Sequence, residues 1–297
     1  MALACSSPLF GQQLQDHATN SSQRVAAALY SSGTRLFTKK DLEDIEQQLR
    51  QSYTMKRFSL RQINGRIIQI SNPMFQAKNP ICKPYVKFQE YWQLVKAQPH
   101  GPPTEMSLCS YTVDWEDQTT RNSEGIIAQP IQVFDRFYLL WQNSKTCKQL
   151  TALLQDILGI NAVKKVLCFG LGDFCLSMSE WVKKEHGSWD EKYDVENVMS
   201  CIIQHSMAAT IAQLYSGNKT LPIFAQDPGY TELAEEILTK KEFEIVGTHG
   251  AGGFAEIDDE TIIISPFINA PVKQIIADLA RPVLIISTGF EVPNENE

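Results

Sequence analysis

Two residues near the middle of the C-terminal half combine the side chains that acid–base chemistry needs. Asp227 follows an apolar run, and Tyr230 stands three positions later. A carboxylate accepts hydrogen bonds from a ligand amine or hydroxyl, and a phenol orients a ligand or transfers a proton. The alternative is structural: Asp227 would cap a helix or form a turn, and Tyr230 would cover the edge of the core.

A pair of glycines, Gly170 and Gly172, follows another apolar run. Glycines between a strand and a helix allow backbone N–H groups to approach a phosphate or a ribose. The third glycine of the dinucleotide-binding fingerprint is replaced by Cys175, and Asp173 would repel a phosphate. The pair therefore indicates either a nucleotide-type ligand or the close packing of a tight turn.

An acidic run precedes a later apolar segment, with Asp258 and Asp259 between Glu256 and Glu260. Paired carboxylates hold a guanidinium group through charge-assisted hydrogen bonds. Carboxylate oxygens also bind Mg²⁺. The third interpretation is a solvated hairpin without a ligand.

Ser265 places a hydroxyl group at the end of the apolar segment that follows the acidic run. A serine nucleophile needs a base, and His249 is the histidine in a neighbouring loop. The sequence lacks the Gly-x-Ser-x-Gly turn, which disfavours a hydrolase triad. The histidines and the seven cysteines lack metal-ligand spacing, so we expect neither a metal nor another cofactor.

The elements that must position these residues alternate between strands and helices after residue 161. Short apolar strands between helices predict a Rossmann-like α/β domain over residues 161–297, with a mostly parallel sheet and helices on both faces. No helix is expected between the third and fourth strands, which predicts one antiparallel pair. Ligands bind beyond the carboxyl ends of such strands. The expected strands are 166–169, 221–225, 243–247, 261–265 and 283–287; the expected helices are 174–184, 199–215, 231–241 and 270–280, with a charged loop over 190–196.

Residues 1–160 are predicted to form an N-terminal arm and an irregular α+β elaboration. The alternatives are a separate lobe and a segment that wraps the sheet, and the prolines favour wrapping. Thr38 is expected to cap a helix, with Phe37 and Leu42 packed against each other beside it. Prolines between residues 73 and 103 predict irregular structure and a loop near 98–106. The expected elements are a helix over 39–52, strands over 67–71 and 131–134, and a helix over 145–158.

Composition narrows the class of protein further. The 297 residues carry a net charge of −7, which disfavours a broad electrostatic contact with nucleic acid. No apolar run has the length of a membrane span, and the first ten residues lack the features of a signal peptide. We therefore expect a cytoplasmic protein without membrane contact.

Three motifs in a fixed order resemble the "sensitivity to red light reduced" family over about residues 164–286. They are the segment 166–174, the segment Gln226-Asp227-Pro228-x-Tyr230, and the segment 257–261 followed by Ser265-Pro266. The resemblance implies one of two functions. Plant, animal and yeast members are described mainly as regulators. A fungal branch makes arginine-containing cyclodipeptides from two aminoacyl-tRNAs in secondary metabolism. The chain departs from the Asp-Asp-x-x-Glu motif of that branch, because no glutamate follows Asp258-Asp259 at the required distance.

The resemblance to the fungal branch implies a transferase that joins two aminoacyl groups, with aminoacyl-tRNAs as partners. Aminoacyl esters are already activated, so neither ATP nor a metal is required, and the protein must position an amine against an ester carbonyl. Asp227 and Tyr230 would then position the substrates and transfer protons, and Gly170 and Gly172 would face the terminal adenosine. The alternative is a non-enzymatic regulatory or ligand-binding protein that uses the same crevice. Candidates for holding a guanidinium are Asp258, Asp259 and Glu235. Either Ser177 or Ser179 serves as acyl acceptor, or acyl-enzyme chemistry is absent.

Overall fold

The computed structural model describes residues 22–78, 80–96, 106–118, 125–157, 163–177, 190–216, 220–266 and 270–288 of the chain. Within these ranges, no helix is long and apolar enough to cross a membrane. The loop predicted near 98–106 falls almost entirely outside the described residues, as do Ser179 and the part of the predicted helix 174–184 that follows residue 177.

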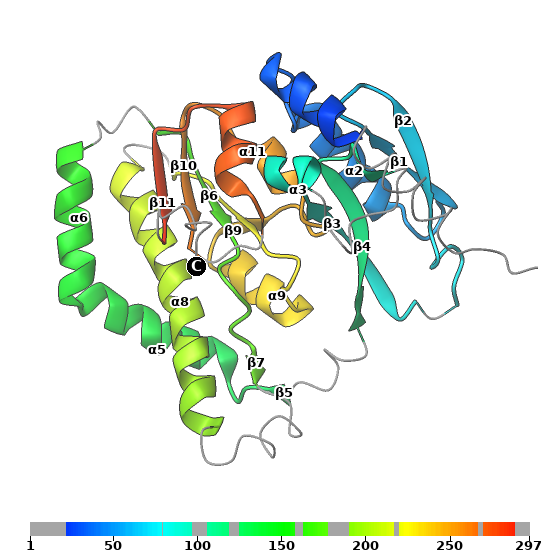
Figure 1. The fold of residues 1–297 in the computed structure, drawn as a ribbon. Helices are drawn as coiled ribbons and strands as arrows, with labels where there is room; N and C mark the ends of the chain where they lie inside the picture. The colour runs from blue at the N-terminus through cyan, green and yellow to red at the C-terminus, as the bar shows by residue number, and fades with distance from the viewer. Residues whose placement is uncertain are drawn as a thin grey trace, which may run out of the picture.

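A sheet of five parallel strands forms the centre of the protein (Figure 1). Its strand order is β11-β10-β6-β8-β9, and every neighbouring pair is parallel. Counted along the chain, this order is 3-2-1-4-5, which is compatible with a Rossmann-like sheet. The strands are β6 (Lys165–Phe169), β8 (Ile223–Gln226), β9 (Phe243–Ile245), β10 (Thr261–Ser265) and β11 (Leu284–Ser287).

The predicted antiparallel pair between the third and fourth strands is wrong. The strands β9 and β10 are not neighbours, because β8 and β6 lie between them. The chain crosses from one to the other through a loop that contains the short helix α10 (Gly252–Ala255). A crossover without a long helix is therefore enough to keep both strands parallel to the rest of the sheet.

Helices cover one face of the sheet, where Val166 and Cys168 of β6 point into an apolar core. This face contacts α5 (Pro130–Asn143), α6 (Lys145–Ile157), α8 (Asp190–Tyr215) and α9 (Glu232–Lys240). The predicted strand 131–134 is wrong, because these residues belong to α5, which begins with Pro130 at a position where proline favours a helix. The predicted charged loop 190–196 is also wrong, since it is the first part of α8.

The predicted helix 174–184 is wrong over its described residues. Residues 176–177 instead form the short strand β7 (Leu176–Ser177), which pairs antiparallel with β5 (Gly125–Ile126). This pairing joins the loop after β6 to a segment about fifty residues earlier in the chain. A contact of that kind overrides local helix propensity.

The other face of the sheet, where Leu167 and Phe169 point, packs against the N-terminal half of the chain and against α11 (Val272–Leu279). The helix α2 (Lys39–Arg50) begins after Thr38, whose hydroxyl accepts a hydrogen bond from the Asp41 N–H at 3.2 Å, as predicted. The remaining elements are β1 (Arg57–Arg61) paired with β2 (Ile67–Ser71), β3 (Cys82–Phe88) paired with β4 (Tyr111–Asp117), and the helix α3 (Tyr91–Val95).

Two buried or half-buried carboxylates join the N-terminal half to the sheet. Glu46 of α2 accepts hydrogen bonds from three backbone N–H groups of residues 249–252, at 3.0–3.1 Å. Asp278 of α11 accepts from the N–H groups of Leu36 at 2.8 Å and of Phe37 at 3.0 Å. The division of the chain at residue 160 stays a prediction, but the two halves share one apolar core.

Candidate functional site

Three cavities lie beyond the carboxyl ends of the parallel strands. The central cavity, of about 490 Å³, is lined by Tyr85, Phe88, Glu116, Gly170, Asp227 and Phe254, among others. The acidic cavity, of about 840 Å³, is lined by Lys83, Gln118, Tyr230, Thr231, Glu232 and Glu235, among others. The switch cavity, of about 570 Å³, is lined by Tyr30, Tyr91, Trp92, Ser265, Lys273 and Gln274, among others.

The segment formed by β3 and the start of α3 contributes to all three cavities. Its residue 83 lines the acidic cavity, residues 85–88 line the central cavity, and residues 90–92 line the switch cavity. The paired strands β3 and β4 stand beside the central sheet in Figure 1. The N-terminal half therefore supplies one wall of a row of cavities whose other wall is formed by the strand-end loops.

His249 holds β3 in this position. Its Nδ1–H donates to the Pro84 carbonyl at 2.7 Å, and its own carbonyl accepts from the Val86 N–H at 2.8 Å. Burial lowers the pKa of His249, which favours the neutral ring. Among the described residues, no hydrogen bond joins His249 to Ser265, so the structure brings no serine–histidine pair together.

The candidate catalytic residue Asp227 binds the backbone of the two central loops. Its carboxylate accepts from the Gly172 N–H at 2.9 Å and from the Gly229 N–H at 2.8 Å. Asp173, which lies in the loop after β6, in turn accepts from the Thr231 N–H at 2.5 Å, where α9 begins after β8. Each loop therefore holds the other through a carboxylate.

The glycine pair lies at the carboxyl end of β6, as predicted, in the left-handed backbone region. Gly170 has φ of 65° and Gly172 has φ of 83°. Their N–H groups, however, are engaged within the protein, that of Gly170 by the Gln226 carbonyl at 3.0 Å and that of Gly172 by Asp227. These two donors are therefore occupied by acceptors of the protein itself.

Tyr230, the second candidate catalytic residue, is 4% exposed. Its hydroxyl group donates to His205 Nε2 at 2.8 Å, and His205 Nδ1–H donates to the Cys201 carbonyl at 2.7 Å. Burial raises the pKa of Tyr230 and lowers the pKa of His205 to about 4. Both rings are therefore neutral near pH 7 and form a buried hydrogen-bonded chain between α8 and the loop after β8.

The His205 environment predicts a pH-dependent stability. The folded pKa of about 4 lies below the ordinary value of 6.5, so the contribution of the neutral ring is complete above pH 6.5. As the pH falls from 6.5 towards 4, the unfolded chain takes up a proton that the folded chain does not. We expect a loss of about 3 kcal/mol in the free energy of unfolding across this window.

Urea denaturation at pH values between 7.5 and 4.5 measures this loss. The matched variant is His205→Gln, which removes the titrating ring and should flatten the dependence on pH, leaving the slope that His249 and the carboxylates contribute. An equal slope in the variant and the native chain would show that His205 is not the responsible group.

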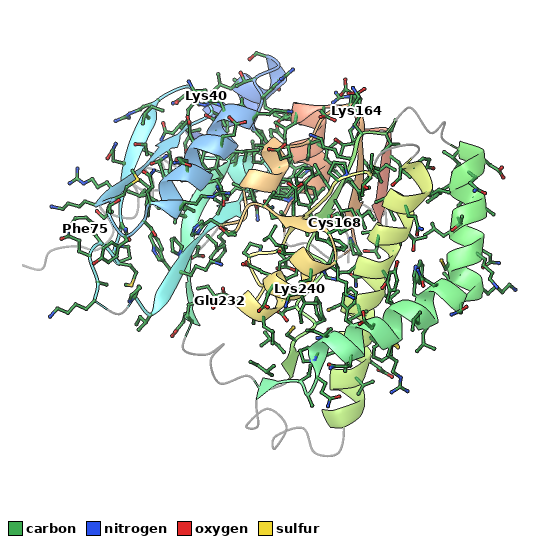
Figure 2. The ribbon with its side chains drawn as sticks, turned by 180° about the vertical axis from the view of Figure 1, so that it is seen from behind. Lys40, Phe75, Lys164, Cys168, Glu232 and Lys240 are labelled. Carbon is green, nitrogen blue, oxygen red and sulfur yellow. The ribbon has the colours of Figure 1, made fainter. Side chains whose placement is uncertain are left out.

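The acidic candidates lie at opposite edges of the sheet. Glu235 lines the acidic cavity at the carboxyl edge, where burial raises its pKa against the opposing effect of Lys83. Asp258 and Asp259 lie at the opposite edge, before β10 begins. Asp258 pairs with Lys165 at 2.8 Å, and Asp259 accepts from the Arg281 N–H at 2.6 Å. Figure 2 shows this separation through Lys164 and Glu232, which lie towards opposite ends of the strands.

Ser265 ends β10 and lines the switch cavity. It is 4% exposed, and its Oγ has no hydrogen-bond partner among the residues that the structure describes. An unpaired buried hydroxyl group is uncommon in folded proteins and calls for an explanation. The side chain of Ser177, one of the two candidate acyl acceptors, lies outside the described part of the chain, as does Ser179.

The wall that β3 and β4 provide, including Tyr85 and Glu116, was not predicted from the sequence. A signal was present in β4, where apolar Tyr111, Val113 and Trp115 alternate with polar residues. In β3, Pro84 argues against a strand when only the sequence is considered. However, β3 pairs on one side with β4, and proline is tolerated in edge strands.

The two hydrogen bonds to Asp227 predict that Asp227→Asn destabilises the protein. An amide has one acceptor oxygen, so one of the two backbone N–H groups loses its partner and faces another donor. We expect a loss of about 1–3 kcal/mol in the free energy of unfolding, measured by urea denaturation. Asp44→Asn, at an exposed position of α2, is the control. Equal stability of the two variants would show that these two hydrogen bonds contribute little to the stability of the fold.

A family model of the SRR1 domain matches residues 150–297. The match covers just under half of the 297 residues of the chain. This match supports the resemblance to the "sensitivity to red light reduced" family and does not extend to its fungal branch. Searches among curated proteins and among solved structures found no match. The SRR1 domain contains all five strands of the sheet, whereas β3 and β4 lie outside the matched range.

Proposed function

We propose that the SRR1 domain binds a small organic cation along the row formed by the central and acidic cavities. The observation that carries the proposal is the placement of these adjoining cavities, of about 490 and 840 Å³, at the carboxyl edge of the sheet. Ligands of α/β sheets bind at this edge, in pockets of comparable volume. This proposal corresponds to a ligand-binding or regulatory SRR1 protein.

The charges along the two cavities favour a cation over an anion. Glu232 and Glu235 line the acidic cavity, and their mutual repulsion adds to the burial that raises the pKa of Glu235. A bound ammonium or guanidinium group would relieve this repulsion and form charge-assisted hydrogen bonds. The positive charge of Lys83 reduces this preference for a cation in part. The positive charge of Lys87 is offset by Asp114, with which it pairs at 3.2 Å. Tyr85 and Phe88 supply apolar surface for the rest of the ligand.

Calorimetric titration tests the cation proposal with two probes of equal size, arginine methyl ester and citrulline methyl ester. We expect the arginine ester to bind at least tenfold more tightly, because the side chain of citrulline lacks the guanidinium charge while the α-amino group is the same in both esters. Glu235→Gln should remove this difference. Glu236→Gln is the matched control, since Glu236 is the next residue and its carboxylate pairs at 2.6 Å with Lys240 on the exposed face. Equal binding of both esters, or none at millimolar concentration, would contradict the proposal.

A second candidate is the tRNA-dependent synthesis of arginine-containing cyclodipeptides. The observation that favours it is the presence of two adjoining cavities, one of them acidic, which give two aminoacyl groups separate places. The amine of one aminoacyl group would attack the ester carbonyl of the other, form an amide bond and release a tRNA hydroxyl. A second attack would close the ring and release the second tRNA.

The hydrogen bonds of Asp227 and Tyr230 favour a positioning role for both in such a reaction. Glu235 is the better candidate for proton acceptor, because a raised pKa brings a carboxylate closer to the pH at which an amine is deprotonated. The test is incubation with radiolabelled arginine in a tRNA-competent extract. A labelled diketopiperazine that disappears after RNase treatment and in Glu235→Gln, but not in Glu236→Gln, would support the synthase. Its absence with every partner amino acid would leave the binding proposal alone.

A further inference from the structure

We propose that the switch cavity is a second ligand site, one that binds a phosphate monoester attached to a planar ring, as in a nucleoside monophosphate. This cavity lies beyond the carboxyl ends of β10 and β11, at the edge where parallel α/β sheets bind ligands. The proposal does not depend on the cation site.

The first observation is the hydroxyl group of Ser265. The residue is 96% buried, its Oγ lacks a partner within the described ranges, and it lines the cavity. Leaving a buried hydroxyl group unpaired costs about 1–3 kcal/mol. A ligand oxygen in the cavity would supply the missing partner, so the hydroxyl group points to a ligand rather than to a structural contact.

The second observation is the start of α11, which lies at the same cavity. The N-cap residue Pro271 makes no side-chain hydrogen bond to the first turn, and Lys273 in that turn lines the cavity. The N–H groups of Val272 and Gln274 in this turn donate to the backbone carbonyls of Ala270 and Pro271, at 2.8 and 3.0 Å. The positive end of the helix dipole and the charge of the lysine favour a phosphate. Glu90 is the carboxylate among the described lining residues, and it lies at the start of α3, where that helix favours an acidic side chain.

The third observation is aromatic surface on the opposite wall. The rings of Tyr30 and Tyr91 stack with centroids 4.3 Å apart, and Trp92 is 53% exposed. Gln274 fixes this wall to α11, because its Oε1 accepts from the Tyr91 N–H at 2.9 Å. Exposed aromatic rings stack on planar ligands with little dependence on the ring's substituents. A cavity of about 570 Å³ has room for both the ring and the phosphate.

The loop after β6 does not compete for this role. Its two glycine N–H groups donate to Gln226 and Asp227, and the Asp173 carboxylate lies in the same loop, whereas Lys273 adds a positive charge at the start of α11. We therefore expect the phosphate beside Ser265 and Lys273 rather than at the loop after β6.

Calorimetric titration of the full chain with AMP, adenosine and inorganic phosphate tests the site. We expect AMP to bind at least tenfold more tightly than adenosine or phosphate alone, because each of these has one half of the ligand. Ser265→Ala and Lys273→Gln should each weaken AMP binding at least fivefold. Lys240→Gln, which changes an exposed lysine on α9, should leave it within twofold.

Stability separates a binding role of Ser265 from a structural one. Because its hydroxyl group is unpaired, Ser265→Ala should leave the midpoint of thermal unfolding unchanged or raise it. The proposal is overturned if AMP binds no better than adenosine, if AMP does not bind at 1 mM, or if neither variant changes its affinity. Ser265→Ala should not change binding of arginine methyl ester, and Glu235→Gln should not change binding of AMP, so either site can fail without the other.

Discussion

Gly172→Val is expected to lower the free energy of unfolding by about 3–5 kcal/mol, from two separate effects. Gly172 has φ of +83°, where a β-branched residue is strained. A Cβ atom at this position would also lie 2.5 Å from Cys201 Sγ on α8. The Cys201 side chain, the loop or α8 must move, and the loop is held by the hydrogen bond from the Gly172 N–H to Asp227.

A matched control separates backbone strain from steric overlap. Gly65 has nearly the same φ of +85°, but a Cβ atom there would meet nothing within 4 Å. Gly65→Val should therefore show the strain alone, and urea denaturation of both variants gives the difference. Cys201→Ala should recover part of the loss in Gly172→Val, measured as a coupling in a double-mutant cycle. Equal losses at Gly65 and Gly172 would show that α8 adapts to the added side chain.

The sheet could be predicted because its signals are local. The strands β6 and β10 are continuous apolar runs of strand length, and the helices α9 and α11 between or beside them show helical periodicity. The placement of Gly170 and Asp227 side by side follows from the rule that parallel strands end at one edge. The strand order itself depends on where each crossover passes, which local sequence does not specify.

The same rule on strand ends explains why Asp258 and Asp259 do not lie at the candidate site. Asp258 and Asp259 precede β10, and in a parallel sheet the residues before a strand lie at the edge opposite to those after a strand. Their pairing with Lys165 and the Arg281 backbone is the result. The roles of Asp173 and Asp227 were harder to predict, because each carboxylate binds a loop about 55 residues away.

The wall formed by β3 and β4 could not be predicted for a different reason. A two-stranded antiparallel unit is marginal by itself and is stabilised by the surface on which it packs. Here that surface includes the loop of His249 and Gly250, whose position depends on the sheet. Local sequence therefore predicts the part of the candidate site that the sheet edge forms. It does not predict the wall that β3 and β4 of the N-terminal half form.

The contact between Glu46 and the loop that contains His249 fixes the wall formed by β3 and β4. Glu46→Ala is expected to lower the free energy of unfolding by about 3–5 kcal/mol, because it leaves three backbone N–H groups without their acceptor. Glu46 is 3% exposed and accepts from the N–H groups of His249, Ala251 and Gly252. The same loop binds β3 through the His249 ring and carbonyl, so the loss should extend to the cavity wall.

Urea denaturation followed by far-ultraviolet circular dichroism measures this loss, with Glu43→Ala as the control at an exposed position of the same helix. The control should change stability by less than about 0.5 kcal/mol. Glu46→Gln should lie between the two, since the amide oxygen still accepts from part of the loop. If Glu46→Ala matched Glu43→Ala, water would have replaced the carboxylate. A single unfolding transition in the native chain that splits in Glu46→Ala would show that this carboxylate couples the N-terminal half to the SRR1 domain.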